Sequence, residues 1–323
     1  MITIPKLAIR FFFPIFVLFS IISSLAVIFI ILTPPLWGIL IFYSIWWYRD
    51  RETPWKNGRP SQWVRSWKAW KYCADYFNSE LIKTTDLPLD RNYVFAIHPH
   101  GVLGTATIFN FVTEARNITE KFKLDFRIVT LPINFRIPFH RDLELALGLI
   151  SSDADSIEYT LSLDTKGKAV CIVPGGAEES LDAHPGNYDL TLKQRKGFVR
   201  LALKTGSDLV PVYNFGETSI FHQIPNARGS FIRKMQQAFK SATGIAPIIC
   251  CGRGFIMRGV GIIPIQAKIA TVVGAPIRVK MNSNPSKKEI DNLHDEYVSA
   301  LIKLFDEHKV KYGVPEDAQL RIV

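Results

Sequence analysis

Arg91 to Gly101, RNYVFAIHPHG, joins an apolar run to a pair of histidines. Residues 93–97 are β-branched and aromatic, which predicts a buried strand. Pro99 cannot continue a central strand and Gly101 permits unusual backbone angles, so we expect the strand to open into a loop at His98-Pro99-His100-Gly101. Sites of α/β proteins commonly form at the carboxyl ends of strands. Histidine titrates near neutral pH, so His98 and His100 suit general-base chemistry, although one capping and one core histidine would also fit.

Strand-like and helix-like segments alternate downstream of this stretch. The predicted strands are Phe126–Leu131, Ala169–Val173, Leu209–Tyr213 and Ile269–Val273. The predicted helices are Gln62–Phe77, Asp155–Thr165, Arg195–Lys204 and a C-terminal helix that begins at the capping box Ser286/Glu289 and ends near Gly313. This alternation is typical of the α/β class and predicts a largely parallel sheet covered by helices. The tryptophan-rich face of the first helix suits either the core or a lipid interface.

Upstream of the sheet the chain is strongly apolar. Residues 11–32 carry no charge and are long enough for a helix to cross a hydrocarbon core of about 30 Å. Pro34-Pro35 interrupts the run, and residues 36–48 form a second apolar segment that ends in aromatic side chains before charged ones. We therefore predict a transmembrane hairpin as a membrane anchor over 1–50, with 36–48 either spanning fully or re-entrant, and a cytosol-facing catalytic domain over 51–323. A cleaved signal peptide fits poorly, because the apolar region is too long and lacks a small-residue cleavage site.

The charge balance and the cysteine pattern indicate which binding partners and which cellular compartment the chain suits. The chain of 323 residues has 39 Lys and Arg against 29 Asp and Glu, a net charge of +10. This balance favours a membrane surface or a phosphate-bearing substrate; nucleic acid ranks last, because no nucleic-acid motif is present. The four cysteines form no C-x-x-C pair, as is typical of a reducing compartment. The sequon at Asn117 would stay unmodified on a cytosolic face.

A glycine-rich motif and a basic cluster are the other candidate binding elements. In residues 173–181, VPGGAEESL, Gly175 and Gly176 could bring backbone amides close to an oxyanion or a phosphate, and Glu179 could orient an imidazole. An ordinary glycine-rich turn with solvated glutamates is the alternative. The basic residues Arg195, Lys196 and Arg200 stand at a predicted helix start, where anions are favoured, although a solvated basic face would look similar.

Three blocks together resemble the type-2 diacylglycerol acyltransferase family, which also contains monoacylglycerol and wax-alcohol acyltransferases. They are HPHG at 98–101, PGGAEES at 174–180 and RKGFVRLALKTGSDLVPVYNFGE at 195–217. The resemblance extends from the apolar hairpin through Asn134–Pro138 and Gly252-Arg253-Gly254 to the tail at 304–309, so it covers nearly the whole chain.

The resemblance implies an enzyme of the endoplasmic-reticulum membrane that could also be located on lipid droplets. It would move a fatty acyl group from acyl-CoA to a lipid hydroxyl. Diacylglycerol is the acceptor that the resemblance favours, and monoacylglycerol and a wax alcohol are the alternative acceptors. His98 is the preferred base, with His100 and Glu179 as supporting catalytic residues, although the sequence does not decide between the histidines. The implied acyl-CoA-binding residues are Gly101, Gly175, Gly176, Arg195, Lys196 and Arg200. No cofactor or metal is implied, and acyl-chain preference and homo-oligomer formation stay open.

The chain is also distantly similar to the glycerol-phosphate acyltransferases, which implies a similar fold. Those enzymes carry an Asp five residues after the catalytic His, whereas this chain has Leu103 after His98 and Thr105 after His100. An orienting carboxylate must therefore come from elsewhere, and Glu179 is the first candidate.

Two other classes of function fit the sequence less well. A membrane-anchored metallohydrolase would use His98 and His100 as metal ligands, but it needs further ligands at later strand ends. A serine hydrolase is disfavoured because no G-x-S-x-G motif occurs.

Overall fold

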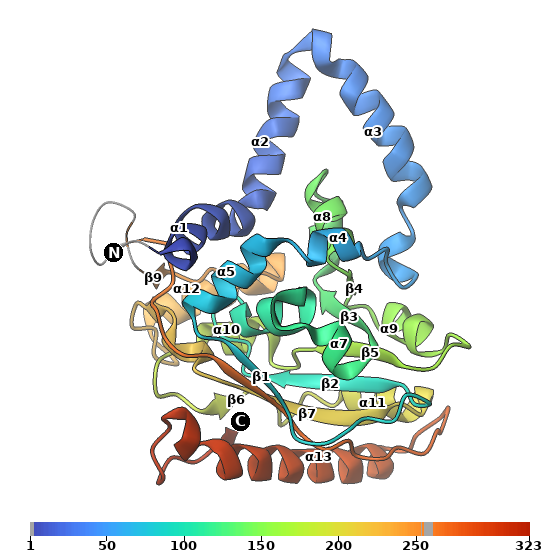
Figure 1. The fold of residues 1–323 in the computed structure, drawn as a ribbon, viewed down its shortest axis with the longest axis vertical. Helices are drawn as coiled ribbons and strands as arrows, with labels where there is room; N and C mark the ends of the chain where they lie inside the picture. The colour runs from blue at the N-terminus through green and yellow to red at the C-terminus, as the bar shows by residue number, and fades with distance from the viewer. Residues whose placement is uncertain (1–2, 253, 255–260) are drawn as a thin grey trace.

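A seven-stranded sheet forms the centre of the computed structural model, which describes residues 3–252, 254 and 261–323. The strand order is β1-β10-β7-β2-β5-β3-β4 (Figure 1). The bounds are β1 Glu80–Lys83, β2 Tyr93–His98, β3 Asp125–Thr130, β4 Leu149–Ser151, β5 Lys168–Ile172, β7 Asp208–Phe215 and β10 Ala270–Val273. All neighbours pair in parallel except β10 and β7, which are antiparallel. The predicted largely parallel α/β sheet is confirmed.

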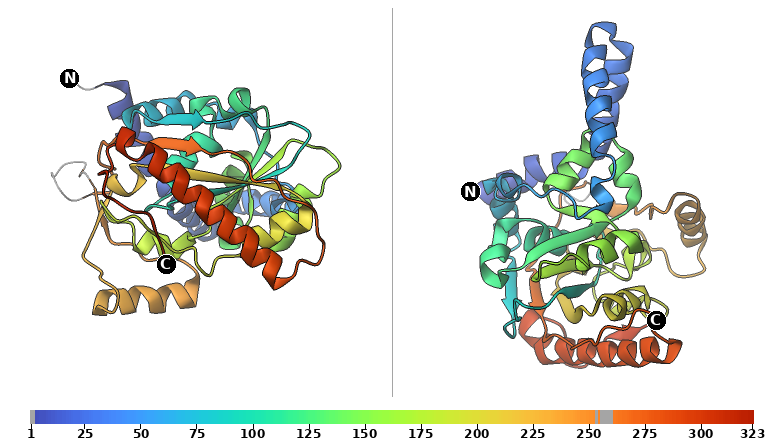
Figure 2. Two further views of the ribbon diagram at one scale, coloured as in Figure 1. Left: turned by 90° about the horizontal axis from the view of Figure 1, so that it is seen from below. Right: turned by 90° about the vertical axis from the view of Figure 1, so that its right-hand side faces the viewer.

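Helices cover both faces of this sheet, as Figure 2 shows from two further directions. Their bounds are α4 Gln62–Arg65, α5 Lys68–Tyr76, α6 Thr105–Thr107, α7 Ile118–Phe122, α8 His140–Ala146, α9 Ala154–Leu161, α10 Gly176–Leu181, α11 Gly197–Thr205, α12 Phe231–Thr243 and α13 Lys287–His308. The small strands are β6 Asp189–Leu190, β8 His222–Gln223, β9 Cys250–Cys251 and β11 Arg321–Ile322. The predicted capping box at Ser286 and Glu289 is confirmed as the start of α13.

The central strand β2 divides the core into two apolar layers. Tyr93, Phe95 and Ile97 belong to the layer that includes α5, whereas Val94 and Ala96 belong to the layer that includes α11 and α13. Side chains alternate between the faces of a strand, so His98 continues the second series. Its side chain therefore points towards α13.

Two sequence-based expectations about helices are corrected. The predicted helix over 62–77 is broken, because Trp67 leaves the helical conformation between α4 and α5, with φ −58° and ψ 132°. Its tryptophans separate accordingly: Trp70 is buried in the core, while Trp63 is 73% exposed. The helix predicted to end at Thr165 ends at Leu161.

The apolar N-terminal run is not one helix. It divides at Leu18 into α1 (Ile4–Val17) and α2 (Phe19–Leu32), which meet at 56°. α1 lies against α5, and its Ile9 and Phe13 side chains are buried, because they pack on the domain's aromatic core. The apolar run over 11–32 is therefore divided by a bend at Leu18, and its first part packs on the domain.

The projecting part of the N-terminus is a hairpin of α2 and α3 (Trp37–Asp50), seen at the top of Figure 1. Each helix has 14 residues and is thus about 21 Å long, shorter than a hydrocarbon core of about 30 Å. In the described part of the chain no single helix has the length and hydropathy of a membrane span. The bent pair α1 and α2 reaches that length and composition only together.

A polar cluster fastens the base of this hairpin to the domain. Asp50 at the end of α3 pairs with Arg141 of α8 at 2.7 Å and with Arg59 at 3.2 Å. Burial would raise the pKa of Asp50, but hydrogen bonds from Thr53 and Arg141 hold that pKa below its usual value. The Tyr43 hydroxyl also donates to Asp142 at 2.7 Å. The hairpin therefore has a defined attachment to the domain.

Candidate active site

His100 lies in the loop after β2, half-buried, with a polar neighbour on α10. Its Nδ1 lies 2.8 Å from the Ser180 hydroxyl and 3.0 Å from the Gly101 carbonyl oxygen. A carbonyl oxygen only accepts hydrogen bonds, so this arrangement places the ring proton on Nδ1. The Ser180 hydroxyl lies 3.4 Å from the Gly176 carbonyl, to which it donates. In this tautomer Nε2 of His100 carries the lone pair, and it has no hydrogen-bond partner among the described residues.

His98 has a different environment, because its side chain is 0% exposed. Its Nε2 lies 3.1 Å from the hydroxyl of Tyr297 on α13. That hydroxyl donates to the Ala96 carbonyl at 3.0 Å, so Nε2 of His98 is the donor to Tyr297. Burial raises the pKa of Tyr297 well above its usual value, which keeps the hydroxyl protonated. Nδ1 of His98 has no hydrogen-bond partner among the described residues.

Glu179 joins the two histidines to the rest of the site. It is 3% exposed, and its Oε2 accepts a hydrogen bond from the backbone N–H of His100 at 3.0 Å. Its Oε1 accepts from the backbone N–H of Thr191 at 3.1 Å and lies 3.8 Å from Nδ1 of His98. A carboxylate is the one side chain group that can accept on both oxygens at once. Glu179 therefore holds the HPHG loop, α10 and the segment before α11 together.

Two glycines permit the close approach of carboxyl groups to these loops. A Cβ on Gly175 would overlap the Glu179 carboxyl, and a Cβ on Gly101 would overlap Glu217. Gly101 also has a φ of +65°, which disfavours other residues. Burial raises the pKa of Glu217 to about 8, although hydrogen bonds from the backbone N–H groups of Thr105 and Ala106 lower it.

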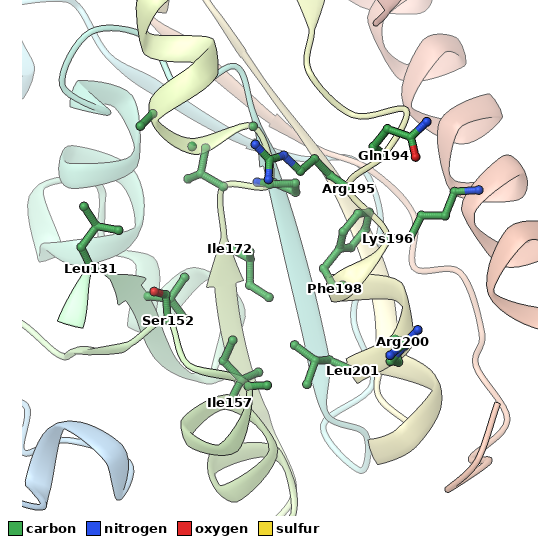
Figure 3. A pocket seen from close by; sticks show the side chains of 18 of the residues that line it. Leu131, Ser152, Ile157, Ile172, Gln194, Arg195, Lys196, Phe198, Arg200 and Leu201 are labelled. Carbon is green, nitrogen blue, oxygen red and sulfur yellow. The ribbon is translucent and has the colours of Figure 1, made fainter. Parts of the chain in front are cut away.

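A cavity of about 1050 Å³ lies beside this cluster. Five of the six predicted acyl-CoA-binding residues line it, namely Gly175, Gly176, Arg195, Lys196 and Arg200. Figure 3 shows Arg195, Lys196 and Arg200 around its basic side and Leu131, Ile157, Ile172 and Leu201 around its apolar side. Gly101 does not line this cavity, and neither histidine does. Helix α10 connects the cavity to the histidine loop, because its Gly176 lines the cavity and its Ser180 contacts His100.

The three basic residues of the cavity are not equivalent. Nζ of Lys196 pairs with Asp291 of α13 at 2.6 Å, and its side chain extends towards α13 in Figure 3. Arg195 and Arg200 are exposed and have no ion-pair partner among residues 3–252, 254 and 261–323. These two guanidinium groups are therefore the ones available to an anionic ligand.

Three residues of the site escaped prediction from the sequence, namely Ser180, Glu217 and Tyr297. Ser180 ends the PGGAEES block, but nothing in that block shows which side chain contacts an imidazole. Tyr297 falls on the apolar face of α13, where only its hydroxyl distinguishes it from a core residue. Within the described ranges, no group of three or more His, Cys, Asp or Glu side chains is arranged to hold a metal ion.

Comparison with known proteins shows which family the chain resembles. Residues 29–323 match the family described as diacylglycerol acyltransferase. The chain belongs to the diacylglycerol acyltransferase family. Diacylglycerol O-acyltransferase 2 of Bos taurus is 44% identical over 288 residues, 88% of this chain and 80% of the bovine protein. The Homo sapiens protein of the same name is 42% identical over 299 residues, 92% of this chain and 77% of its own length.

A relative named for a different activity is almost as similar. It is 2-acylglycerol O-acyltransferase 1 of Bos taurus, 43% identical over 285 residues, 88% of this chain and 85% of the bovine protein. Among solved structures, the 1-acyl-sn-glycerophosphate acyltransferase of Thermotoga maritima aligns over 87% of this chain and 94% of its own. Its 16% identity and TM-score of 0.39 are too low to equate the two folds.

Proposed function

We propose that this acyltransferase moves a fatty acyl group from coenzyme A to the free hydroxyl of diacylglycerol. The observation that carries the proposal is the HPHG loop packed against α10, beside a cavity with two arginines that have no ion-pair partner among the described residues. Membership of the diacylglycerol acyltransferase family supports the reaction class. Monoacylglycerol is the second candidate acceptor, because 2-acylglycerol O-acyltransferase 1 is almost as similar in sequence.

In the proposed mechanism His100 is the general base. Its Nε2 removes the proton from the acceptor hydroxyl as the oxygen attacks the thioester carbonyl. The carbon–sulfur bond then breaks, and the proton on His100 neutralises the departing coenzyme A thiolate. No covalent acyl-enzyme is needed, because a thioester is already an activated acyl group.

The geometry favours His100 over His98, the base preferred from the sequence. His98 is fully buried and donates through Nε2 to Tyr297, so an acceptor hydroxyl has no access to that atom. A base must come within hydrogen-bond distance of the proton that it removes. We infer that His98 instead supports the HPHG loop structurally, because its ring lies between the Tyr297 hydroxyl and the Glu179 carboxylate.

Arg195 and Arg200 are proposed to bind the phosphates of coenzyme A in the cavity. Replacing both with Ala should raise the KM for acyl-CoA by about tenfold or more while kcat changes little, because ground-state contacts are lost. Lys196→Ala is the matched comparison: its ammonium is paired with Asp291, so its KM effect should be smaller. Steady-state kinetics with acyl-CoA varied at fixed acceptor measure both constants, and an increase in the acceptor KM alone would contradict the assignment.

The acceptor is tested directly by offering labelled acyl-CoA to microsomes with diacylglycerol, monoacylglycerol or a long-chain alcohol. Formation of labelled triacylglycerol at the highest kcat/KM supports the proposal. Preferential labelling of diacylglycerol would favour monoacylglycerol as acceptor, and labelled wax ester would favour an alcohol.

We also propose that residues 1–50 are the membrane anchor and that the domain over 51–323 faces the cytosol, at the endoplasmic reticulum or on lipid droplets. The α2–α3 hairpin is apolar and exposed, and its helices are too short to span, so it suits a re-entrant insertion. External protease should then degrade the domain in sealed microsomes, and Asn117 should carry no glycan. A domain protected until detergent is added would refute this topology.

A further inference from the structure

Helix α12 packs against the domain in an unusual orientation, with its polar side inward. Arg233 is 1% exposed and pairs with Glu178 and Asp182, both at 2.7 Å. Lys240 pairs with Glu178 as well, and the buried Gln236 receives a hydrogen bond from Asn226 at 3.0 Å. The side that holds α12 to the protein is therefore made of ion pairs and amides.

The opposite side of α12 is apolar and exposed. Phe231, Met235 and Phe239 recur at four-residue spacing and are 76%, 59% and 50% exposed, and Ile232, Ile245 and Ile249 extend the surface. A core-facing helix places its apolar residues inward, so this arrangement is the reverse of the usual one. A contiguous exposed apolar surface on a protein typically marks a site of interaction.

The charge of this segment indicates what covers the surface. Residues 224–249 contain Arg228, Arg233, Lys234 and Lys240 but no Asp or Glu. Lys234 is exposed beside the apolar face and has no ion-pair partner in the described part of the chain, and the whole protein carries +10. Arg228, Arg233 and Lys240 are ion-paired with Asp182 or Glu178, so Lys234 is the cation left beside the apolar face in the described residues. An exposed apolar face with a lysine at its edge, on a helix of 13 residues in a basic protein, suits a helix that lies in an anionic lipid interface.

We propose that α12 is a second membrane-contacting element, which inserts its apolar face into an anionic phospholipid bilayer beside the catalytic cavity. Figure 2 shows α12 projecting from the side of the domain, separate from the α2–α3 hairpin. Lys240 and Gly244, at the end of α12, line the cavity that contains Gly175 and Gly176. Glu178 pairs with Arg233 and is adjacent in sequence to Glu179. A bilayer on α12 would therefore lie next to the site in which the lipid acceptor is proposed to react.

A depth probe on α12 tests this surface without relying on activity. Met235→Cys, labelled with the polarity-sensitive fluorophore NBD and reconstituted in phosphatidylglycerol-containing vesicles, should show blue-shifted emission that is lost with nitroxide-labelled lipid. Labelled wild type, subtracted in parallel, corrects for the native cysteines. Lys303→Cys on α13, where the side chain is 76% exposed, is the matched control. Its NBD label should emit as it does in water and should not be quenched by the nitroxide-labelled lipid.

Two further measurements complete the test. Adding Phe231→Ser and Phe239→Ser to the labelled Met235→Cys protein should reverse the blue shift and the quenching, because the apolar face is lost. Water-like emission of Met235→Cys itself would overturn the proposal. Blue-shifted emission without lipid quenching, accompanied by disulfide cross-linking between two unlabelled Met235→Cys chains, would also overturn it and would indicate a second copy of the chain on this face. Failure of acyl transfer would change none of these readings.

Discussion

Replacing His100 with Ala should reduce kcat for acyl transfer by about two to four powers of ten, the usual contribution of a general base. The expectation rests on the free Nε2 of this ring, since Nδ1 is engaged by Ser180 and the Gly101 carbonyl. The side chain is only half-buried, so the melting temperature of the variant should stay close to that of the wild type. Labelled acyl-CoA turnover and thermal unfolding of the same preparation measure the two quantities.

His98→Ala provides the contrast. His98 is fully buried and donates to Tyr297, so its removal should leave a cavity and remove the hydrogen bond that the Tyr297 hydroxyl accepts, which together lower the melting temperature. Activity should fall with the folded fraction and with distortion of the loop. The opposite result would reverse the roles of the two histidines. In that case folded His98→Ala would lose about two to four powers of ten in kcat, and His100→Ala would keep a kcat near that of the wild type.

The sheet was predictable because its central strands are nearly continuous apolar runs. Tyr93–Ile97 and Leu209–Tyr213 are buried on both faces, so their composition alone indicated strands. β1 and β4 were missed because Glu80–Lys83 is half polar and Leu149–Ser151 is only three residues long. These strands are stabilised by their neighbours in the sheet rather than by their own sequence.

The apolar N-terminus shows the limit of hydropathy as a guide to structure. Residues 11–32 are uniformly apolar, so composition could not show that half of α1 packs on the domain while α2 projects from it. α1 differs from α2 in its tertiary contacts: the rings of Phe12 and Phe16 pack on the ring of Trp70, with centroid distances of 4.7 and 4.9 Å. Tertiary contacts of this kind are absent from any local pattern.

The site was predictable as a set of motifs but not as a geometry. HPHG and PGGAEES indicated histidines, glycines and a carboxylate, and the structure brings His98, His100 and Glu179 together. Which histidine is accessible depends on Tyr297, about two hundred residues away along the chain and part of an otherwise apolar helix face. The number and order of such long-range contacts cannot be obtained from motif spacing.

Glu179→Gln should lower kcat by roughly a hundredfold with little change in the KM for acyl-CoA. An amide offers one acceptor oxygen, so one of the two backbone N–H groups, of His100 or of Thr191, would face an NH₂ donor in place of an acceptor. The HPHG loop would then shift relative to α10, and a misplacement of about 1 Å is enough to cost two powers of ten in rate. Glu179 therefore acts through the position of His100.

The separation of kcat from KM is the informative measurement for Glu179, because a general loss of folding would lower the active fraction without that signature. Glu307→Gln, an identical change on the exposed side of α13, is the matched control and should leave both constants and the melting temperature unchanged. Glu179→Asp should also fail to restore the rate, since a shorter side chain cannot hold both N–H groups at 3.0 and 3.1 Å without moving one loop. Wild-type kcat in Glu179→Gln would show that the two hydrogen bonds do not position His100 for catalysis.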